Sequence, residues 1–184
     1  MRESDESVYL RYLEGEEDGL RVLMERHREH LTLFLMSYVS NMEDAEELMM
    51  DAFAVVASGC SRFSGKSSFK TWLYGIARHL ASMHLRRQRL RLVTLNIATR
   101  ADENAMPENQ ILRTERNHQL YSALKSLPRD YRDVLYLQEI EGMNIDEIAK
   151  VTGRTKKQIY NLSYRGRQSL REALKRMGID DAQY

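Results

Sequence analysis

The chain has 184 residues, of which 42% are hydrophobic and 30% charged, and its formal net charge at pH 7 is only +1. Its single cysteine, Cys60, excludes an internal disulfide, and neither a secretory signal pattern nor an apolar run of about 18 residues is present. Helix-forming residues dominate, only two prolines occur, and no alternating apolar pattern indicates a sheet. We therefore expect a cytoplasmic, all-α protein with two small helical domains.

Hydrophobic periodicity and capping residues predict four helices in the first half of the chain. Their expected positions are Ser7 to Leu13 with an end near Gly15, Gly19 to about Ser40, a third helix capped by Asn41, and a fourth that begins near Ser67 or Ser68. These helices should form one bundle.

The third helix separates apolar from acidic residues. The apolar set at core spacing consists of Ala45, Leu48, Met49, Ala52, Phe53 and Val56. The remaining positions, which should face solvent, are Glu43, Glu46, Glu47, Met50, Asp51 and Ala54. The third helix should therefore present an acidic side.

A basic segment follows this acidic helix. Residues 52–101 contain nine Lys or Arg and no Asp or Glu, so the near-neutral total charge hides surfaces of opposite sign. The segment includes the loop RFSGKSS (residues 62–68), which is rich in flexible and hydroxyl residues and lies beside aromatic residues. Such a loop is suited to hold an unstacked base and its phosphates. The alternative is a basic helix end that only improves solubility.

The predicted domain boundary lies near the middle of the chain. Residues 94–109 lose the helical periodicity, and we interpret them as a flexible linker between a domain at 1–93 and a domain at 110–184. A helix should resume near Glu108, because Pro107 suits a first helical turn.

The capping pattern predicts two helix starts eleven positions apart in the second domain. Asn144 with Glu147, and Thr155 with Gln158, each pair an N-cap with an acid or amide three residues later. Gly153 should end the first of these helices in a left-handed conformation. The spacing predicts a helix-turn-helix unit whose second helix opens after Thr155.

The second helix of this unit has a polar side opposite an apolar stripe. That polar side carries Lys157, Tyr160, Asn161, Tyr164, Arg165 and Gln168. An ordinary helical hairpin with a solvated face is the alternative. However, residues 148–171 contain seven Lys or Arg and no acid, and a one-sign face with aromatic residues and Asn fits phosphate and base-edge contacts in DNA.

Catalytic and metal-binding patterns are missing from the sequence. The five histidines, His27, His30, His79, His84 and His118, have no cysteine pair and no recognisable third ligand. There is no glycine-rich phosphate loop and no nucleophile with an evident base. We therefore expect no enzyme activity, no metal and no cofactor.

Three segments together resemble a known family. They are EDAEELMMDAFAVV (43–56), SRFSGKSSFKTWLYGIARHLASMHLRRQR (61–89) and LKSLPRDYRDVLYLQEIEGMNIDEIAKVTG (124–153), and they are similar to regions 2 and 4 of the sigma-70 family, in particular its compact extracytoplasmic function (ECF) group. The resemblance implies a protein that binds RNA polymerase core enzyme, recognises the promoter −35 and −10 motifs, promotes DNA opening and is held inactive by an anti-sigma factor. The alternative is a helix-turn-helix regulator that binds DNA without contacting polymerase.

The resemblance also assigns residues to roles. The core polymerase contacts are Glu43, Glu46, Glu47, Met50 and Asp51. The −10 DNA contacts are Phe63, Ser64, Gly65, Lys66, Ser67, Lys70, Thr71, Arg78, His79, Arg86 and Arg87. The −35 DNA contacts are Lys156, Lys157, Gln158, Tyr160, Asn161, Tyr164, Arg165 and Arg167.

The chain departs from the family pattern in its second DNA-reading helix. Tyr160, Asn161 and Leu162 stand where many relatives carry a basic residue, a small residue and Arg. The −35 preference of a typical member therefore cannot be copied to this chain. Gly166 replaces a common alanine, which either permits closer helix packing or costs about 1 kcal/mol of helix propensity.

Overall fold

The computed structural model describes residues 3–16, 18–39, 41–59, 61–95 and 115–179. These residues form helices and their connections without any strand, which confirms the predicted all-α class. The chain divides into two compact units, Met1–Ala105 and Met106–Tyr184. Residues 96–109 of the predicted linker lie outside the described residues, as does the helix start expected near Glu108.

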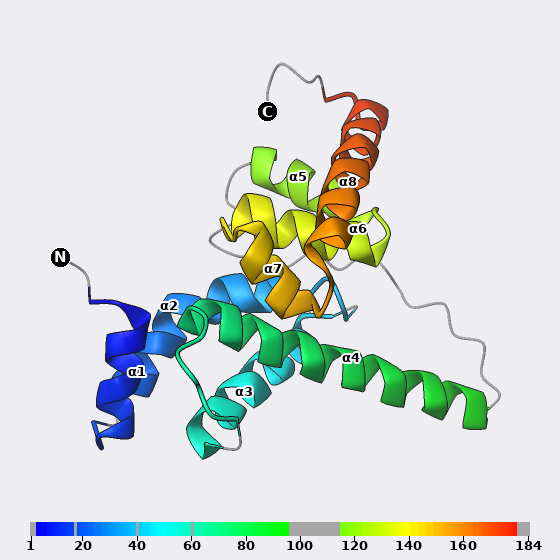
Figure 1. Cartoon of the computed structure of the whole chain (residues 1–184). Helices are drawn as coiled ribbons and strands as arrows, with labels where there is room; N and C mark the ends of the chain where they lie inside the picture. Colours follow the sequence, from blue (N-terminus) through cyan, green and yellow to red (C-terminus); the bar gives the residue numbers. More distant parts are fainter. Residues whose placement is uncertain (1–2, 17, 40, 60, 96–114, 180–184) are drawn as a thin grey trace. The chain divides into compact units, whose positions relative to one another are not determined.

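The first unit is a bundle of four helices (Figure 1). They are α1 (Asp5–Leu13), α2 (Asp18–Leu35), α3 (Met42–Ser58) and α4 (Phe69–Leu95). Helix α2 packs against α1 and α3, and α3 packs against α4. Each predicted helix is present, so the periodicity identified the elements of this unit.

Three helix boundaries differ from the prediction by two residues or more. Helix α1 begins at Asp5 rather than Ser7, because the Ser4 side chain caps it. Helix α2 ends at Leu35 rather than near Ser40, because the chain tightens there: the Ser37 N–H donates to the Phe34 carbonyl (3.0 Å) and the Tyr38 N–H to the Leu35 carbonyl (2.8 Å). Helix α4 continues to Leu95, so residues 94 and 95 of the predicted linker are helical.

The predicted apolar stripes form the core of this unit. All six apolar residues predicted for α3 are buried. For α4, helical spacing predicts a buried face of Phe69, Trp72, Leu73, Ile76, Ala77 and Leu80; the first, third and fifth of these are fully buried and the other three half-buried. Tyr74 was not predicted as a core residue, yet it is fully buried and its ring centroid lies 5.2 Å from that of Phe34. The aromatic rings therefore fill more of the core than helical spacing alone indicated.

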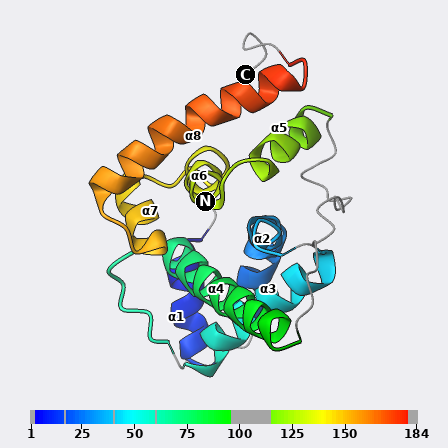
Figure 2. The ribbon, with the colours of Figure 1, turned by 90° about the vertical axis from the view of Figure 1, so that its right-hand side faces the viewer.

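The second unit is a smaller helical bundle (Figure 2). Its elements are α5 (Glu115–Lys125), α6 (Arg129–Leu135), the π-helical turn η2 (Tyr136–Ile140), α7 (Ile145–Thr152) and α8 (Lys156–Arg176). Helix α8 contacts α5, α6 and α7. Its buried cluster includes Ala123, Leu124, Leu127, Leu135, Ala173, Leu174 and Ile179. One long helix thus organises this core.

Two glycines lie where helices approach closely. A Cβ at Gly19 would lie 2.8 Å from the Val8 carbonyl oxygen and 2.9 Å from Tyr12 Cβ, so α1 and α2 meet at this point. A Cβ at Gly166 would lie 3.3 Å from side-chain atoms of Leu135 and Tyr131. Gly166 therefore permits close packing of α8 on α6. This agrees with the expectation that glycine replaces the common alanine there to allow closer helix packing.

Replacing Gly19 by alanine should destabilise the first unit by about 1 to 3 kcal/mol, because backbone and Cβ atoms of α1 must move away. The control is Gly75→Ala in α4, where a Cβ meets nothing within 4 Å. That change should stabilise the unit by about 0.5 to 1 kcal/mol through helix propensity. Urea unfolding followed by fluorescence of Trp72, the only tryptophan of the chain, measures both. Equal stability of Gly19→Ala and the parent would contradict the close approach.

Candidate nucleic-acid and protein interfaces

The acidic side of α3 is exposed as predicted. The helix begins at the N-cap Asn41, whose side chain accepts a hydrogen bond from the Asp44 N–H at 2.7 Å. Its exposed residues include Glu43, Glu46, Glu47, Met50 and Asp51, and the Met50 side chain is 51% exposed. Within the described part of the chain, none of these four carboxylates forms an ion pair. The acidic side is therefore available to a basic partner, with an apolar residue inside it.

The loop between α3 and α4 is anchored by aromatic residues. The Trp72 Nε1–H donates to Ser61 Oγ (3.2 Å), and the Phe63 ring lies 5.3 Å from the Trp72 ring between centroids. Phe63 is half-buried, and it also contacts the rings of Tyr9 and Phe69. Phe63 therefore fixes the loop, while the exposed loop tip is formed by Ser64, Gly65 and Lys66.

Thr71, a predicted −10 DNA contact, is buried rather than exposed. Its side chain is only 2% exposed, and its Oγ1 lies 2.8 Å from Ser68 Oγ in a hydrogen bond. The Thr71 N–H also donates to Ser68 Oγ (3.2 Å), so Ser68 caps the first turn of α4. Thr71 thus belongs to the helix start rather than to a surface that DNA can reach.

The predicted cations of α4 differ in exposure. Lys70 and Arg78 are half-buried, whereas His79, Arg86 and Arg87 are exposed. His79 and Arg86 are seven residues apart and share one side of the helix, while Arg87 points about 100° away. Figure 1 shows the C-terminal turns of α4 extending beyond α2 and α3. The two sides together offer cations to a polyanion along several turns.

The predicted helix-turn-helix is confirmed in its local geometry. Asn144 Oδ1 accepts from the Glu147 N–H (3.0 Å), and the Asn144 N–H donates to Glu147 Oε2 (3.0 Å), which completes a capping box. Gly153 ends α7 in the left-handed region with φ 67°. Thr155 and Gln158 form the second capping box at the start of α8. The turn between the helices is thus determined by local sequence.

The predicted −35 contacts on α8 divide into two groups. The first group is exposed and makes no hydrogen bond or ion pair with any residue that the structure describes: Lys157, Tyr160, Asn161, Tyr164 and Arg165. Tyr160 and Tyr164 are 62% and 66% exposed. Large aromatic side chains that lie together on a surface often mark a binding site.

The second group has partners within its own unit. Lys156 forms an ion pair with Asp146, which raises the pKa of Lys156 through the hydrogen bond and the charge of that carboxylate. Gln158 Oε1 accepts from the Thr155 N–H (2.9 Å), and Arg167 pairs with Glu139 (2.9 Å). These three side chains lie at the edges of the exposed side, where a DNA contact competes with an existing bond.

The opposite side of α8 fixes the direction of this exposed side. Ile159 is fully buried, and Ser163 Oγ donates to Gln138 Oε1 at 2.6 Å. Gly166 permits the close contact with α6 described above. Gln138 and Glu139 belong to the π-helical turn η2, which was not predicted. This turn therefore supplies polar partners to α8 on one edge.

These features define a two-unit helical protein with a helix-turn-helix in its second unit. The family model for Sigma-70 region 2 matches residues 23–91, and the family model for Sigma-70, region 4 matches residues 117–170. The ECF RNA polymerase sigma factor SigX of Bacillus subtilis is 30% identical over 174 residues, which covers 90% of each chain. The ECF RNA polymerase sigma-E factor of Escherichia coli K12 is 27% identical over 158 residues, 80% of this chain and 82% of that protein. The chain therefore belongs to the ECF sigma factor family.

Two solved structures share this fold. The sigma factor RpoE from Bartonella quintana, in complex with the anti-sigma factor NepR, gives a TM-score of 0.73 at 22% identity and covers 84% of this chain and 96% of that one. CnrH in complex with the cytosolic domain of CnrY gives 0.67 at 21% identity, with 94% and 98% covered. At this identity the similarity concerns the fold.

In the described parts of the chain, no group of three or more His, Cys, Asp or Glu side chains is arranged to hold a metal ion. None of the described helices is both long and apolar enough to cross a bilayer.

The two groups on α8 should respond differently to mutation. Arg165→Ala should weaken binding to a −35 duplex selected from a random library by about 1 to 3 kcal/mol and relax preference at one position. Arg167→Ala should cause a smaller loss, because a DNA contact of Arg167 must first break its existing pair with Glu139, which reduces the net gain from that contact. Lys157→Ala should weaken all sequences alike and reduce the salt slope by about one unit. Fluorescence anisotropy titrations of DNA at several salt concentrations test this. Identical binding profiles for the three variants would mean that this side of α8 attracts DNA only through its charge.

Proposed function

We propose that this chain is an ECF-type sigma subunit that binds core RNA polymerase, recognises the −35 and −10 promoter motifs and promotes DNA opening. The observation that carries the proposal is that one chain of this family combines an exposed, unpaired acidic side on α3 with a basic, aromatic exposed side on α8. The first suits a basic protein surface and the second a DNA groove. A subunit that brings polymerase to promoters requires both.

Each surface receives one task in this proposal. The acidic side of α3, centred on Glu47 and Met50, contacts core polymerase. The exposed side of α8 reads the −35 motif, where Asn161 is suited to pair with adenine and the two tyrosine rings with thymine methyl groups. The loop tip at Ser64–Lys66, with the cations of α4, holds the −10 strand.

The loop must offset the cost of removing a base from the DNA stack. Unstacking costs a few kcal/mol, and contacts with the extruded base and its phosphates must supply that free energy. The exposed loop tip offers backbone and hydroxyl groups, while Lys66 and Arg86 offer cations and His79 a ring N–H to the phosphates. No covalent step is involved, so the proposed role is non-catalytic and needs no cofactor.

An anti-sigma factor is part of the proposal. RpoE and CnrH, which share this fold, were each solved in complex with a protein partner, and NepR is described as an anti-sigma factor. We extend such a partner to this chain and place its action in the cytoplasm, where polymerase transcribes. A regulator that binds DNA without polymerase is the competing function, and it would leave the acidic side of α3 without a task.

The direct experiment is transcription with reconstituted holoenzyme. Core polymerase from the source bacterium, with and without this chain, is given a random-sequence promoter library, and the transcripts are sequenced. Transcription of a defined motif set only when the chain is present supports the proposal. DNA binding by the chain without co-purification of core enzyme would favour the regulator instead.

Charge reversal on α3 should weaken the polymerase contact without unfolding the protein. Glu47→Lys with Asp51→Lys should weaken core binding by roughly thirty-fold or more, about 2 kcal/mol, because two attractive contacts become repulsive. The control is Glu14→Lys with Glu172→Lys, which changes the net charge equally at two exposed sites. Affinity is measured by titrating core enzyme with labelled protein. Equal affinity of the α3 variant and the control would exclude this side as the contact.

Loss of Lys66 in the loop and Lys70 in the first turn of α4 should impair opening more than binding. Lys66→Ala with Lys70→Ala should reduce run-off transcription from a selected duplex promoter more than from the same promoter with a mismatched −10 bubble, because the bubble removes the cost of unstacking. Binding to a −35 duplex should not change. An equal loss on both templates would assign the lysines to general DNA attraction.

A further inference from the structure

Helix α1 lies outside the part of the chain that matches Sigma-70 region 2, residues 23–91, and no function is assigned to it above. It nevertheless contacts the start of the segment that joins α3 to α4. The Tyr12 hydroxyl donates to the Ala57 carbonyl oxygen at 3.2 Å, in the last turn of α3. Tyr12 therefore restrains the point from which this segment leaves α3.

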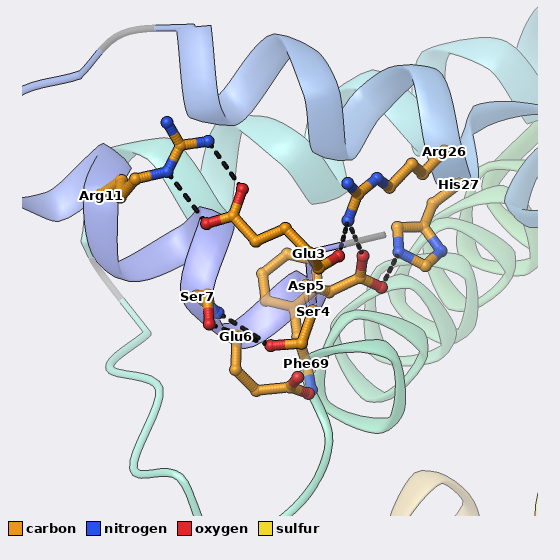
Figure 3. Close-up of polar contacts among 9 residues, drawn as sticks. All are labelled: Glu3, Ser4, Asp5, Glu6, Ser7, Arg11, Arg26, His27 and Phe69. Atoms are coloured by element: carbon orange, nitrogen blue, oxygen red, sulfur yellow. Dashed lines mark hydrogen bonds and ion pairs between the residues drawn. The ribbon is translucent and has the colours of Figure 1, made fainter. Parts of the chain in front are cut away.

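The same helix also holds the end of this segment. The Phe69 N–H, at the first residue of α4, donates to Glu6 Oε1 at 2.8 Å (Figure 3). The first N–H groups of a helix have no partner within the helix, and a carboxylate is favoured there by the helix dipole. Glu6 thus acts as a cap on α4 that is supplied by another helix, 63 residues away in sequence.

Between these two polar contacts, Tyr9 packs against the aromatic anchor of the loop. Its ring centroid lies 5.8 Å from Phe63, 5.3 Å from Phe69 and 5.5 Å from Trp72, and the residue is 2% exposed. The contact with Phe63 is edge-to-face, an orientation that aromatic pairs favour. One helix therefore contacts the start, the aromatic anchor and the end of the segment.

Helix α1 is itself fixed to α2 by a partly buried polar cluster. Asp5 accepts from Arg26 Nη1 (2.7 Å) and is hydrogen-bonded to His27 Nε2 (2.6 Å), and Arg26 also donates to the Glu3 carbonyl oxygen (2.9 Å; Figure 3). Burial raises the pKa of Asp5, but the hydrogen bonds and charges of Arg26 and His27 outweigh this and lower the pKa below its usual value. The carboxylate is therefore stabilised in its charged form, and α1 is held in place.

We propose that α1 positions the loop at residues 61–68 for capture of the −10 strand, with Glu6 and Tyr12 as positioning residues. The proposal rests on the function proposed above. A loop that is ordered before DNA arrives loses less conformational entropy on binding than a free loop. By restraining both ends, α1 lowers this cost without contacting DNA.

The test removes the polar contacts while it leaves the aromatic core intact. The variant Glu6→Ala with Tyr12→Phe deletes both hydrogen bonds and retains the aromatic ring at position 12. The single variant Glu6→Gln keeps an acceptor oxygen for the Phe69 N–H, so it should behave as the parent chain does. The control is Arg21→Ala on α2, which breaks exposed contacts with Asp18 and Glu25 and touches no part of the loop.

The first measurement is acrylamide quenching of Trp72 in the full chain without polymerase. Trp72 bonds Ser61 and packs on Phe63, so its accessibility reports on the loop. Quenching should increase, roughly twofold, in the double variant and remain at the parent value in Glu6→Gln and Arg21→Ala. Unchanged quenching in the double variant would overturn the proposal, whatever the function of the chain.

The second measurement is run-off transcription by holoenzyme on a promoter selected from the random library. The double variant should lose about tenfold on the duplex and much less on the same promoter with a −10 bubble, at unchanged affinity for core enzyme. Glu6→Gln should match the parent on both templates. A merely structural defect would lower core binding and both templates together, and that result, or full duplex activity despite a loosened loop, would refute the positioning role.

The two measurements separate this proposal from the proposed function. If the parent chain supports no transcription with core enzyme, the sigma function fails, and the positioning of a promoter-binding loop fails with it. The quenching result then still shows whether α1 holds the loop. If the parent transcribes normally and the double variant transcribes as well as the parent, the sigma function stands and only the positioning role fails.

Discussion

The one-sided burial of each helix is the constraint on which the rest of the structure depends. Units of this size bury a limited fraction of their surface, so no helix can leave its apolar stripe uncovered. When Ala45, Leu48 and Ala52 turn inward on α3, the acidic residues between them must turn outward. The same holds for α8, where burial of Ile159 and Gly166 directs Tyr160, Asn161 and Tyr164 outward. The candidate binding surfaces are therefore consequences of the packing.

Features that depend on neighbouring residues could be predicted from the sequence. The capping boxes at Asn144 and Thr155 and the left-handed Gly153 require only a few consecutive residues, so the helix-turn-helix was predicted with correct boundaries. The stripe of α3 was likewise predicted in full, because its period is set by the helix itself. Family resemblance added the roles of these surfaces, which local physics does not specify.

Features that depend on distant residues were missed. The pair of Arg167 with Glu139 joins residues 28 positions apart in sequence, and no local pattern indicates it. Phe63 reads as part of a flexible loop until Tyr9 and Trp72 surround its ring. Thr71 is a polar residue beside the exposed loop, yet the start of α4 buries it. In each case the missing information is which other element lies nearby, and periodicity does not contain it.

The anchor of α1 also bears on whether the loop responds to pH. Because the pKa of Asp5 is lowered from 3.8, its contribution to stability is complete above the ordinary carboxylate pKa and is lost only as pH falls through the lower value of the folded state. Near neutral pH Asp5 is fully ionised and accepts from both Arg26 and His27. The His27 bond needs only a proton on Nε2, which both the neutral and the charged ring can carry. Arg26 keeps its charge across the physiological range, so its hydrogen bond to the Asp5 carboxylate holds α1 in place there whatever the charge of His27.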